Sequence, residues 1–350
     1  MHPQRAVAMS IERNDINGYH NPKISVIITA YNRTDFLLTA ITSVLHHGTD
    51  KFGLEVIVVS NRDFSIGETL YGTNIRKIIM EGSIGEFLSE AIESATGDII
   101  AFLDDDDIWT ENKIRRLAYV FSDMRVIFYH NMYSYIDSHG NPMKYVRKTE
   151  KNNFDAFKSS LVFNFSSDPK QLREAIERRA DFNLSCIAVR RYFALEYVDT
   201  LKMITSAPDG FFFWTALLSK GNLYIDNLKL TQYRVHQLNV SGSRSYEDKV
   251  KELHREIRTF ELLNSLLNSV NMEDKFVALV RNWLQLYDNE YKLIAFVFNN
   301  GGKKLIIISM LSLMKTGFRT RNTLKNRALG FGILSILSMK LAKIVYINIG

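Results

Sequence analysis

The sequence predicts an α/β protein with a mostly parallel sheet flanked by helices, followed by a helical C-terminal extension. Short apolar runs rich in β-branched residues alternate with helix-like stretches over residues 23–125, an order typical of parallel strands joined by crossover helices. Polar segments directly follow several of these runs. Beyond residue 245 the pattern is helical, and 350 residues suffice for a large core with such an appendage.

Four strands are expected in the first part of the chain, at residues 24–29, 54–59, 75–80 and 99–103, and the first of them is expected to be buried. Thr34 can cap a first helix, whose apolar residues recur at helical spacing up to Leu45. A second helix is expected at residues 85–95, and Gly97 ends it. Strand and helix therefore alternate as a parallel sheet requires.

Three polar segments lie where expected strands end, at residues 30–33, 60–63 and 104–107. Ligands of open α/β sheets bind beyond the carboxyl ends of the strands. We therefore expect these segments to meet in one site.

The rest of the chain is predicted to be mixed and then helical. Strands are expected at residues 126–136, 183–190 and 228–235, and helices at residues 169–179, 208–219, 245–270 and 273–298. The predicted division is a polar extension (1–22), a main domain (23–243, with halves 23–125 and 126–243), a helical region (244–300) and a basic apolar tail (301–350).

Cysteine content and hydropathy favour a cytoplasmic protein. Cys186 is the only cysteine, so no intrachain disulfide can form, which fits a reducing compartment. The first 21 residues lack the apolar segment of a signal peptide. No apolar run reaches the roughly 20 residues that a membrane-spanning helix needs.

An aspartate cluster is the strongest chemical signal in the sequence. Four consecutive aspartates, at positions 104–107, directly follow an apolar strand and precede Ile108 and Trp109. Adjacent carboxylates repel one another by about 1 kcal/mol per close pair even in water, and Mg²⁺ or Mn²⁺ would remove that cost. The alternative is a solvated acidic turn that caps a following helix.

Four segments in order carry a family resemblance. They are Ser-Val-Ile-Ile-Thr-Ala-Tyr-Asn-Arg at 25–33, Glu-Val-Ile-Val-Val at 55–59, Gly85 with Ala-Thr-Gly-Asp at 95–98, and Phe-Leu-Asp-Asp-Asp-Asp at 102–107. Together they resemble the family 2 glycosyltransferases over residues 23–125, and weaker similarity continues to about 243. The resemblance implies the GT-A fold, with its Rossmann-like sheet.

The resemblance also implies roles for individual residues. The residues it places against the nucleotide-sugar are Thr29, Ala30, Tyr31, Arg33, Asn61, Gly85, Asp104, Asp105 and Arg234. Those it places at a divalent metal, Mn²⁺ or Mg²⁺, are Asp106, Asp107 and His236. Asp209, at a helix start, matches the family's general base.

Each role has a simpler alternative. Tyr31 could be a packed aromatic, Asp209 could cap its helix, and His236 could be an ordinary surface histidine. Arg33 and Arg234 could be solvated charges.

One departure from the family pattern concerns the nucleotide base. The family usually has an acidic pair after its second strand, where this chain has Ser60 and Asn61. An amide accepts a hydrogen bond as a carboxylate does, but it also donates. This departure leaves the preferred base open.

The expected reaction follows from the resemblance. It is metal-dependent transfer of a sugar, with inversion, from a nucleoside diphosphate donor of the UDP type to a hydroxyl of a glycan or lipid-linked acceptor. Two alternatives remain: a non-catalytic sugar- or lipid-binding protein on a degenerate scaffold, and a nucleotidyltransferase. A dinucleotide-dependent dehydrogenase is excluded because no G-x-G-x-x-G follows the first strand.

The tail predicts contact with a membrane surface. After Glu290 the chain has ten basic residues and no acidic one, so the remaining 34 Lys and Arg are outnumbered by the 38 acids. Two apolar runs of about a dozen residues in this tail suit helices lying on an anionic cytoplasmic membrane face. The alternative is a helix pair packed on the core. Few aromatic residues accompany the charges, so nucleic acid is not an expected partner.

Overall fold

The computed structural model describes most of the chain between residues 22 and 311. The described residues are 22–45, 53–66, 69–70, 73–144, 159–164, 169–178, 180–219, 221–236, 246–268, 275–298, 306–308 and 310–311. Nearly all of the predicted N-terminal extension (1–22) and of the predicted basic tail (301–350) lies outside them. No helix in the described ranges is long and apolar enough to cross a bilayer.

Strands and helices alternate through the first part of the chain. The strands are β1 (Ile24–Ala30), β2 (Leu54–Ser60), β3 (Thr69–Leu70), β4 (Thr73–Ile79), β5 (Ile99–Asp104), β6 (Ile108–Trp109), β7 (Val126–Ile136), β8 (Pro142–Met143), β9 (Leu161–Phe163), β10 (Ile187–Arg190) and β11 (Asn222–Arg234). The helices are α2 (Leu37–Leu45), α3 (Ile84–Ser94), α4 (Lys113–Val120), α6 (Pro169–Glu177), the 3₁₀ turn η2 (Leu184–Cys186), α7 (Arg191–Glu196), α8 (Val198–Leu201), α9 (Pro208–Leu218), α10 (Tyr246–Asn268) and α11 (Lys275–Phe298).

The sheet is mixed, with a parallel centre. Its strand order is β3-β4-β2-β1-β5-β10-β7-β11-β6, with β8 on β7 and β9 on β11. Strands β4, β2, β1 and β5 are mutually parallel, β10 is antiparallel to both of its neighbours, and β11 is parallel to β7. Consequently β1, β2, β5, β7 and β11 all end at the same edge, and β10 begins there.

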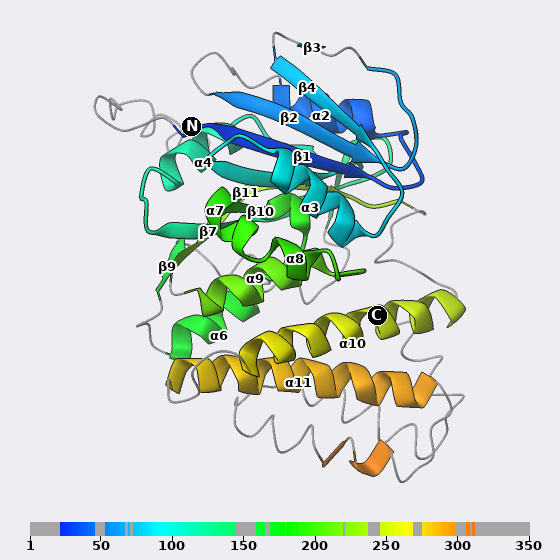
Figure 1. Ribbon diagram of the computed structural model, residues 1–350, viewed down its shortest axis with the longest axis vertical. Coiled ribbons are helices and arrows are strands. Elements are labelled where there is room, and N and C mark those ends of the chain that lie inside the picture. Colours follow the sequence, from blue (N-terminus) through cyan, green and yellow to red (C-terminus); the bar gives the residue numbers. More distant parts are fainter. Residues whose placement is uncertain are drawn as a thin grey trace.

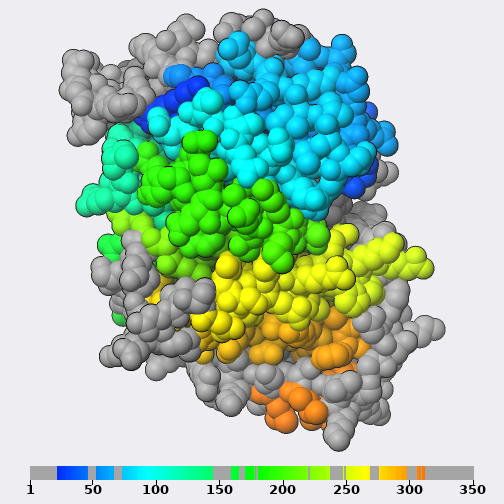
Figure 2. Space-filling model, in the orientation of Figure 1, coloured from blue at the N-terminus to red at the C-terminus, as the bar shows by residue number. Residues whose placement is uncertain are grey.

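Helices cover both faces of this sheet. The buried apolar residues of α2 and α4 pack on one face, and those of α3 and α9 on the other. Helices α10 and α11 form an outer layer on the α9 side (Figure 1). Their buried side chains belong to the same core as those of α3 and α9, and Figure 2 shows them in contact with the α/β part of the molecule.

The α/β class with its helical extension is confirmed, two local predictions were wrong, and three helices were missed. Residues 183–186 form a turn before the short β10, where a continuous strand was expected. β11 begins at Asn222, six residues before the predicted strand. Helices α4, α7 and α8 were not predicted, because they are short and their charged residues obscure the apolar spacing.

Candidate active site

The sheet register explains why distant residues meet at the carboxyl edge. Thr29 of β1 lies beside Asp104 of β5, and Ala30 lies beside Ser60 of β2. Beyond β5 the chain turns back into β6, which pairs antiparallel with β11. This pairing brings the end of β11, with Arg234 and the following His236, to the aspartates. The three polar segments predicted to meet therefore lie at one edge.

The aspartate segment is folded tightly against the edge and is largely buried. The N–H of Asp105 donates to the carbonyl of Thr29 (3.2 Å), and the N–H of Asp107 donates to that of Asp104 (3.2 Å). Asp105, Asp106 and Asp107 are only 4%, 5% and 1% exposed. Buried carboxylates need donors or cations, so the partners of this segment decide its chemistry.

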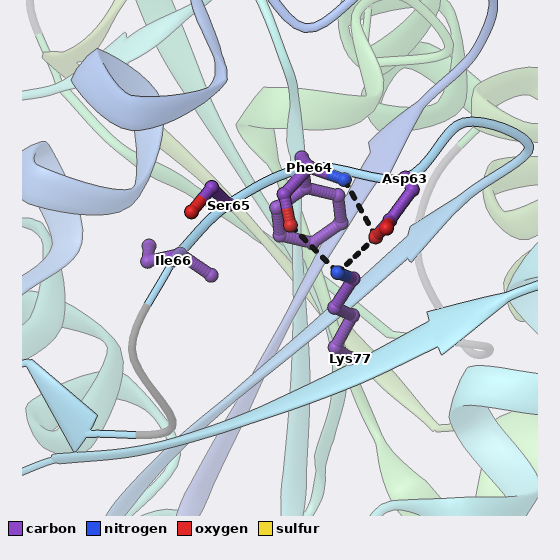
Figure 3. A pocket seen from close by; sticks show the side chains of 5 residues that line it. All are labelled: Asp63, Phe64, Ser65, Ile66 and Lys77. Carbon is purple, nitrogen blue, oxygen red and sulfur yellow. Dashed lines mark hydrogen bonds and ion pairs between the residues drawn. The ribbon is translucent and has the colours of Figure 1, made fainter.

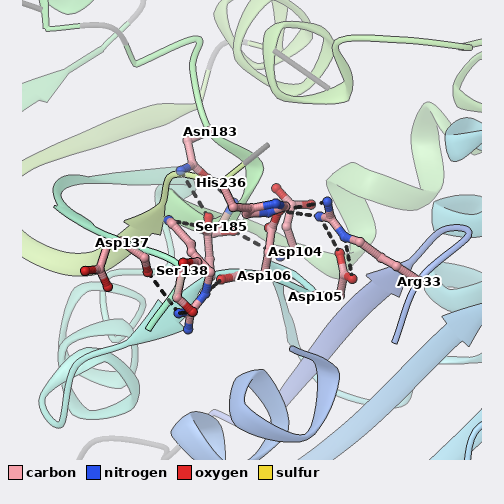
Figure 4. A network of polar contacts seen from close by, with 11 residues as sticks. Arg33, Asp104, Asp105, Asp106, Asp137, Ser138, Asn183, Ser185 and His236 are labelled. Carbon is pink, nitrogen blue, oxygen red and sulfur yellow. Dashed lines mark hydrogen bonds and ion pairs between the residues drawn. The ribbon is translucent and has the colours of Figure 1, made fainter. Parts of the chain in front are cut away.

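Arg33 is the cation that faces this segment. Its guanidinium donates in bidentate fashion to Asp105, from Nε and Nη2 at 2.9 Å each, and also contacts the carboxylate of Asp106 (Figure 4). The hydrogen bond with Asp105 and the neighbouring negative charges raise the Arg33 pKa, although burial alone would lower it. The structure thus brings Arg33 to the site, as expected, but against carboxylates.

His236 and Arg234 approach from β11. His236 Nε2 lies 3.0 Å from Asp106 Oδ2 and 3.5 Å from Arg33 Nη1. Arg234 donates its backbone N–H to Asp107 Oδ1 (2.9 Å) and its Nε to the carbonyl of Asp106 (2.7 Å). Its guanidinium lies 4.6 Å from the ring centre of Phe36. Arg234 therefore holds the backbone of the aspartate segment in place.

Burial and like charges raise the pKa values of three aspartates. The Asp104 pKa lies well above its ordinary value because of burial and the charges of the other aspartates. Burial raises the Asp105 pKa to about 6, against the hydrogen bond from Arg33. Burial and the charge of Asp106 raise the Asp107 pKa to about 7. Arg33 and Arg234 together bring two positive charges to four carboxylates, and such an excess of negative charge is typical of sites that bind a cation.

Asp209 lies at the start of α9 and faces the same cluster. Its Oδ1 accepts the N–H of Gly210 (3.0 Å), and its Oδ2 accepts the N–H of Asn183 (2.9 Å). Its charge contributes to the raised Asp104 pKa, so the two carboxylates are close enough to interact. The structure thereby brings the predicted base to the predicted donor site.

Tyr31 and Asn61 lie at the opposite end of the site. Tyr31 is 53% exposed, and its ring contacts Phe87 edge-on at 5.9 Å. Asn61 forms a reciprocal pair with Asn32: it accepts the Asn32 N–H and donates to the Asn32 side chain, both at 2.8 Å. The Asn61 amide therefore fixes the turn that carries Tyr31, and a contact of Asn61 with the base stays a prediction.

Gly85 has a packing role in the structure. A Cβ at this position would lie 2.0 Å from the carbonyl oxygen of Leu201 and 2.5 Å from that of Ile204. The Gly85 N–H donates to the Ile204 carbonyl (3.0 Å). Only glycine allows α3 to approach this segment so closely, and its expected contact with the nucleotide-sugar stays a prediction.

No preformed metal cage is present among the described residues, where no three His, Cys, Asp or Glu side chains converge as metal ligands. Asp106 and His236 lie together, but both oxygens of Asp107 accept N–H groups, from Arg234 and Asn183. The expected set of Asp106, Asp107 and His236 is therefore not assembled as three ligands.

Sequence reasoning missed Asn183 and Ser185. Asn183 donates from Nδ2 to Asp107 (3.2 Å), and the Ser185 hydroxyl accepts the N–H of Asp104 (3.0 Å). They reach the site because β10 is antiparallel to β5, so its beginning lies at the carboxyl edge. The Asn-x-Ser spacing, which is typical of a side-chain capped turn, was the available signal.

A separate cavity of about 340 Å³ lies beyond β2. It is lined by Asp63, Phe64, Ser65, Ile66 and Lys77 (Figure 3). Lys77 contacts the Asp63 carboxylate and donates to the carbonyl of Phe64 (2.6 Å). None of the aspartates at 104–107 lines this cavity.

Comparison with known proteins gives a consistent family. Residues 25–197 match the family described as Glycosyl transferase family 2. WfaP of Escherichia coli, named UDP-Glc:alpha-D-GlcNAc-diphosphoundecaprenol beta-1,3-glucosyltransferase, is 28% identical over 247 residues, which cover 67% of this chain and 83% of WfaP. The putative teichuronic acid biosynthesis glycosyltransferase TuaG of Bacillus subtilis is 26% identical over 151 residues, 40% of this chain and 59% of TuaG.

Other matches are shorter or structural. An uncharacterized glycosyltransferase, alr2836 of Nostoc sp., is 32% identical over 113 residues, so the match spans 30% of this chain and about a third (34%) of that relative. The crystal structure of S. aureus TarS 1–349 superposes with a TM-score of 0.54 at 13% identity, covering 86% of this chain and 92% of that one. This likeness supports the GT-A fold.

Proposed function

We propose that this chain, which belongs to glycosyl transferase family 2 through residues 25–197, transfers a sugar from a nucleoside diphosphate to an acceptor hydroxyl. The observation that carries the proposal is the buried aspartate cluster of residues 104–107, facing Asp209 at the carboxyl edge of the sheet. Clustered acids at this edge suit the binding of a diphosphate with its counter-ion. A glycosidase would need two carboxylates separated across a sugar cleft.

Asp106 and His236 are the residues that would hold a divalent metal. Their side chains lie 3.0 Å apart, and Mg²⁺ or Mn²⁺ commonly takes one or two protein ligands while phosphate oxygens supply the rest. The donor set therefore fits the ion without a preformed cage. When bound, the metal would neutralise negative charge on the leaving diphosphate.

Arg33 exchanges partners when the donor binds, in this proposal. In the free protein its guanidinium compensates Asp105 and Asp106. A bound diphosphate offers the same guanidinium a bidentate anionic partner, which arginine favours. Tyr31, exposed beside the turn fixed by Asn61, lies where the base can stack.

Asp209 acts as the general base. Its carboxylate is held by two backbone N–H groups, from Asn183 and Gly210. It takes the proton from the acceptor hydroxyl as that oxygen attacks the anomeric carbon. Attack from the face opposite the diphosphate inverts the anomeric centre.

The donor and acceptor classes are proposed from a relative. WfaP is named for a UDP-glucose donor and a lipid diphosphate acceptor. We propose a UDP-sugar donor and a lipid-linked or growing glycan acceptor, used at the cytoplasmic membrane face. The basic apolar tail expected at residues 301–350 would favour such a location, and it lies mostly outside the described residues.

Thermal unfolding against UDP, GDP and nucleotide-sugars, each with and without Mn²⁺, tests the proposal. A ligand that binds only the native state raises the Tm. We expect a rise that requires both a uridine nucleotide and the metal. Folded protein with no shift for any nucleotide would favour a non-catalytic protein, and consumption of a nucleoside triphosphate would favour a nucleotidyltransferase.

Asp209→Asn separates the base from donor binding. We expect turnover to fall about 10²–10⁴-fold, the usual contribution of a general base, with an unchanged UDP and Mn²⁺ shift. The measurement is steady-state turnover beside thermal unfolding. If the variant lost nucleotide binding together with turnover, Asp209 would be a structural helix cap.

A further inference from the structure

Asn183 contacts both halves of the proposed site. Its backbone N–H donates to Asp209 Oδ2 (2.9 Å), and its side-chain Nδ2 donates to Asp107 Oδ2 (3.2 Å). Its Oδ1 accepts the N–H of Ser185 (2.8 Å), and the residue is 4% exposed. One buried residue therefore joins the proposed base to the aspartate cluster.

Three requirements at this position select asparagine. The backbone is left-handed, with φ 70° and ψ 103°, a region in which asparagine is among the few tolerated side chains. The side chain must donate to a carboxylate and accept from an N–H at the same time. An amide does both, whereas aspartate cannot donate and glycine has no side chain.

The turn that contains Asn183 is anchored to the core. The carbonyl of Ser185 accepts hydrogen bonds from Trp109 Nε1 (2.8 Å) and from the Thr231 hydroxyl (3.1 Å). Trp109 and Thr231 are 1% and 0% exposed. The turn therefore fixes the positions of Asp107 and Asp209, which Asn183 contacts, relative to the buried part of the sheet.

Backbone strain in the described residues is concentrated at this site. The non-glycine residues with positive φ are Asn32, Asn183 and Ala207. Asn32 is clasped by Asn61 near Tyr31, and Ala207 directly precedes the helix turn that carries Asp209. Such strain persists only where surrounding contacts enforce it, and it is typical of functional positions.

We propose that Asn183 is a positioning residue that fixes the base Asp209 relative to Asp107. The inference rests on the proposed function. In this role Asn183 acts through other groups: it sets the distance and orientation of the base Asp209 relative to the aspartate segment that carries Asp106. A displacement of about 1 Å in such a group can cost a hundredfold in rate.

Three variants test the positioning role. Asn183→Gly keeps the left-handed backbone and its N–H but removes the contacts with Asp107 and Ser185. Asn183→Asp keeps the acceptor for Ser185 and places a carboxylate against Asp107. Asn112→Gly is the matched control, because Asn112 lies outside the site at the start of α4 and makes no capping hydrogen bond.

In steady-state assays we expect Asn183→Gly to lower kcat about ten- to a hundredfold, with the donor KM within about twofold of wild type. Asn183→Asp should lose at least as much kcat, and Asn112→Gly should match the wild type. Combined with Asp209→Asn, Asn183→Gly should add no further loss, because both act on one group. Unchanged kcat, or independent losses that multiply, would overturn the inference.

A second experiment, without substrate, measures the coupling between Asn183 and Asp107. Tm values of Asp107→Ala, Asn183→Gly and the double variant form a cycle, and we expect the two shifts to be non-additive because the residues are in contact. Additive Tm shifts would show that Asn183 and Asp107 are not coupled and would overturn the inference. A wild-type protein that turns over no nucleotide-sugar would instead contradict the proposed function and, with it, the positioning role of Asn183.

Discussion

Two buried acidic groups in the same sheet differ in how their charge is compensated. Asp226 of β11 is 0% exposed and accepts from Arg116 Nε (2.6 Å), the Tyr129 hydroxyl (3.1 Å) and the Ser160 hydroxyl (2.9 Å). In the aspartate cluster at residues 104–107, three of the four side chains are also buried, namely those of Asp105, Asp106 and Asp107. There, four carboxylates face two guanidiniums: Arg33 contacts Asp105 and Asp106 directly, and Arg234 donates to the backbone carbonyl of Asp106.

The contrast distinguishes a structural acid from a binding one. The positive charge of Arg116 compensates the negative charge of Asp226, so this pair leaves no excess charge to attract a ligand. The cluster keeps excess negative charge, which raises the pKa of Asp104, of Asp105 to about 6 and of Asp107 to about 7. A site that keeps excess negative charge favours the binding of a cation.

Removal of the compensating cation at the balanced site should give the largest effect on stability. Arg116→Met leaves the Asp226 carboxylate buried without its ion pair, which typically costs about 3–5 kcal/mol. We expect a lower urea midpoint, with an unchanged Tm increment on adding UDP and Mn²⁺. The control Arg125→Met breaks the ion pair between Arg125 and Asp123 at the surface, where the Arg125 side chain is 79% exposed. It should change the unfolding free energy by less than about 1 kcal/mol.

The cluster should show the opposite behaviour, with loss of turnover and no loss of fold. Asp106→Asn removes the carboxylate that faces His236 and Arg33. We expect turnover to fall by about a hundredfold or more, since metal assistance contributes several kcal/mol. The urea midpoint should be unchanged or higher because one repelling charge is gone. An active Asp106→Asn protein would contradict the assignment.

A smaller effect concerns pH. The raised pKa values mean that the folded protein holds protons that the unfolded chain has released, so the unfolding free energy falls as pH rises from about 4 to 7. Each such proton contributes a slope of up to about 1.4 kcal/mol per pH unit. Urea titrations in EDTA should show this slope, and Asp107→Asn should flatten it. Equal slopes in both proteins would refute the pKa assignment.

The sequence predicted the parallel half of the fold and its acidic edge well. Strands β1, β2 and β5 each coincide with a continuous apolar run, because strands buried on both faces need one, and β4, which is partly exposed, coincides with a shorter one. The polar residues that follow β1, β2 and β5 lie close together because neighbouring parallel strands have their carboxyl ends at the same edge of the sheet. Arg33, Asp104, Asp106 and His236 lie at this edge as predicted.

The second half was harder because its strands do not run in one direction. A reversed strand cannot be recognised from its own composition, so nothing marked residues 183–186 as part of the carboxyl edge. The pairing of Arg33 with Asp105 was likewise not predictable, because a side-chain partner 72 residues away depends on the register of the sheet. The hydrogen bond between Asn61 and the Asn32 backbone was not predictable for the same reason, because it also depends on the register of the sheet.

The buried hydroxyl of Thr259 on α10 has a consequence for protein engineering. It donates to the carbonyl of Ser206 (2.9 Å), directly before the left-handed Ala207 and the helix that carries Asp209. A crossover between α9 and α10 is therefore a poor choice for chimeras, because it separates Thr259 from the segment that its hydroxyl contacts. Grafting the helices of another relative onto this sheet would shift the base unless the residues that face Thr259 were transferred with them.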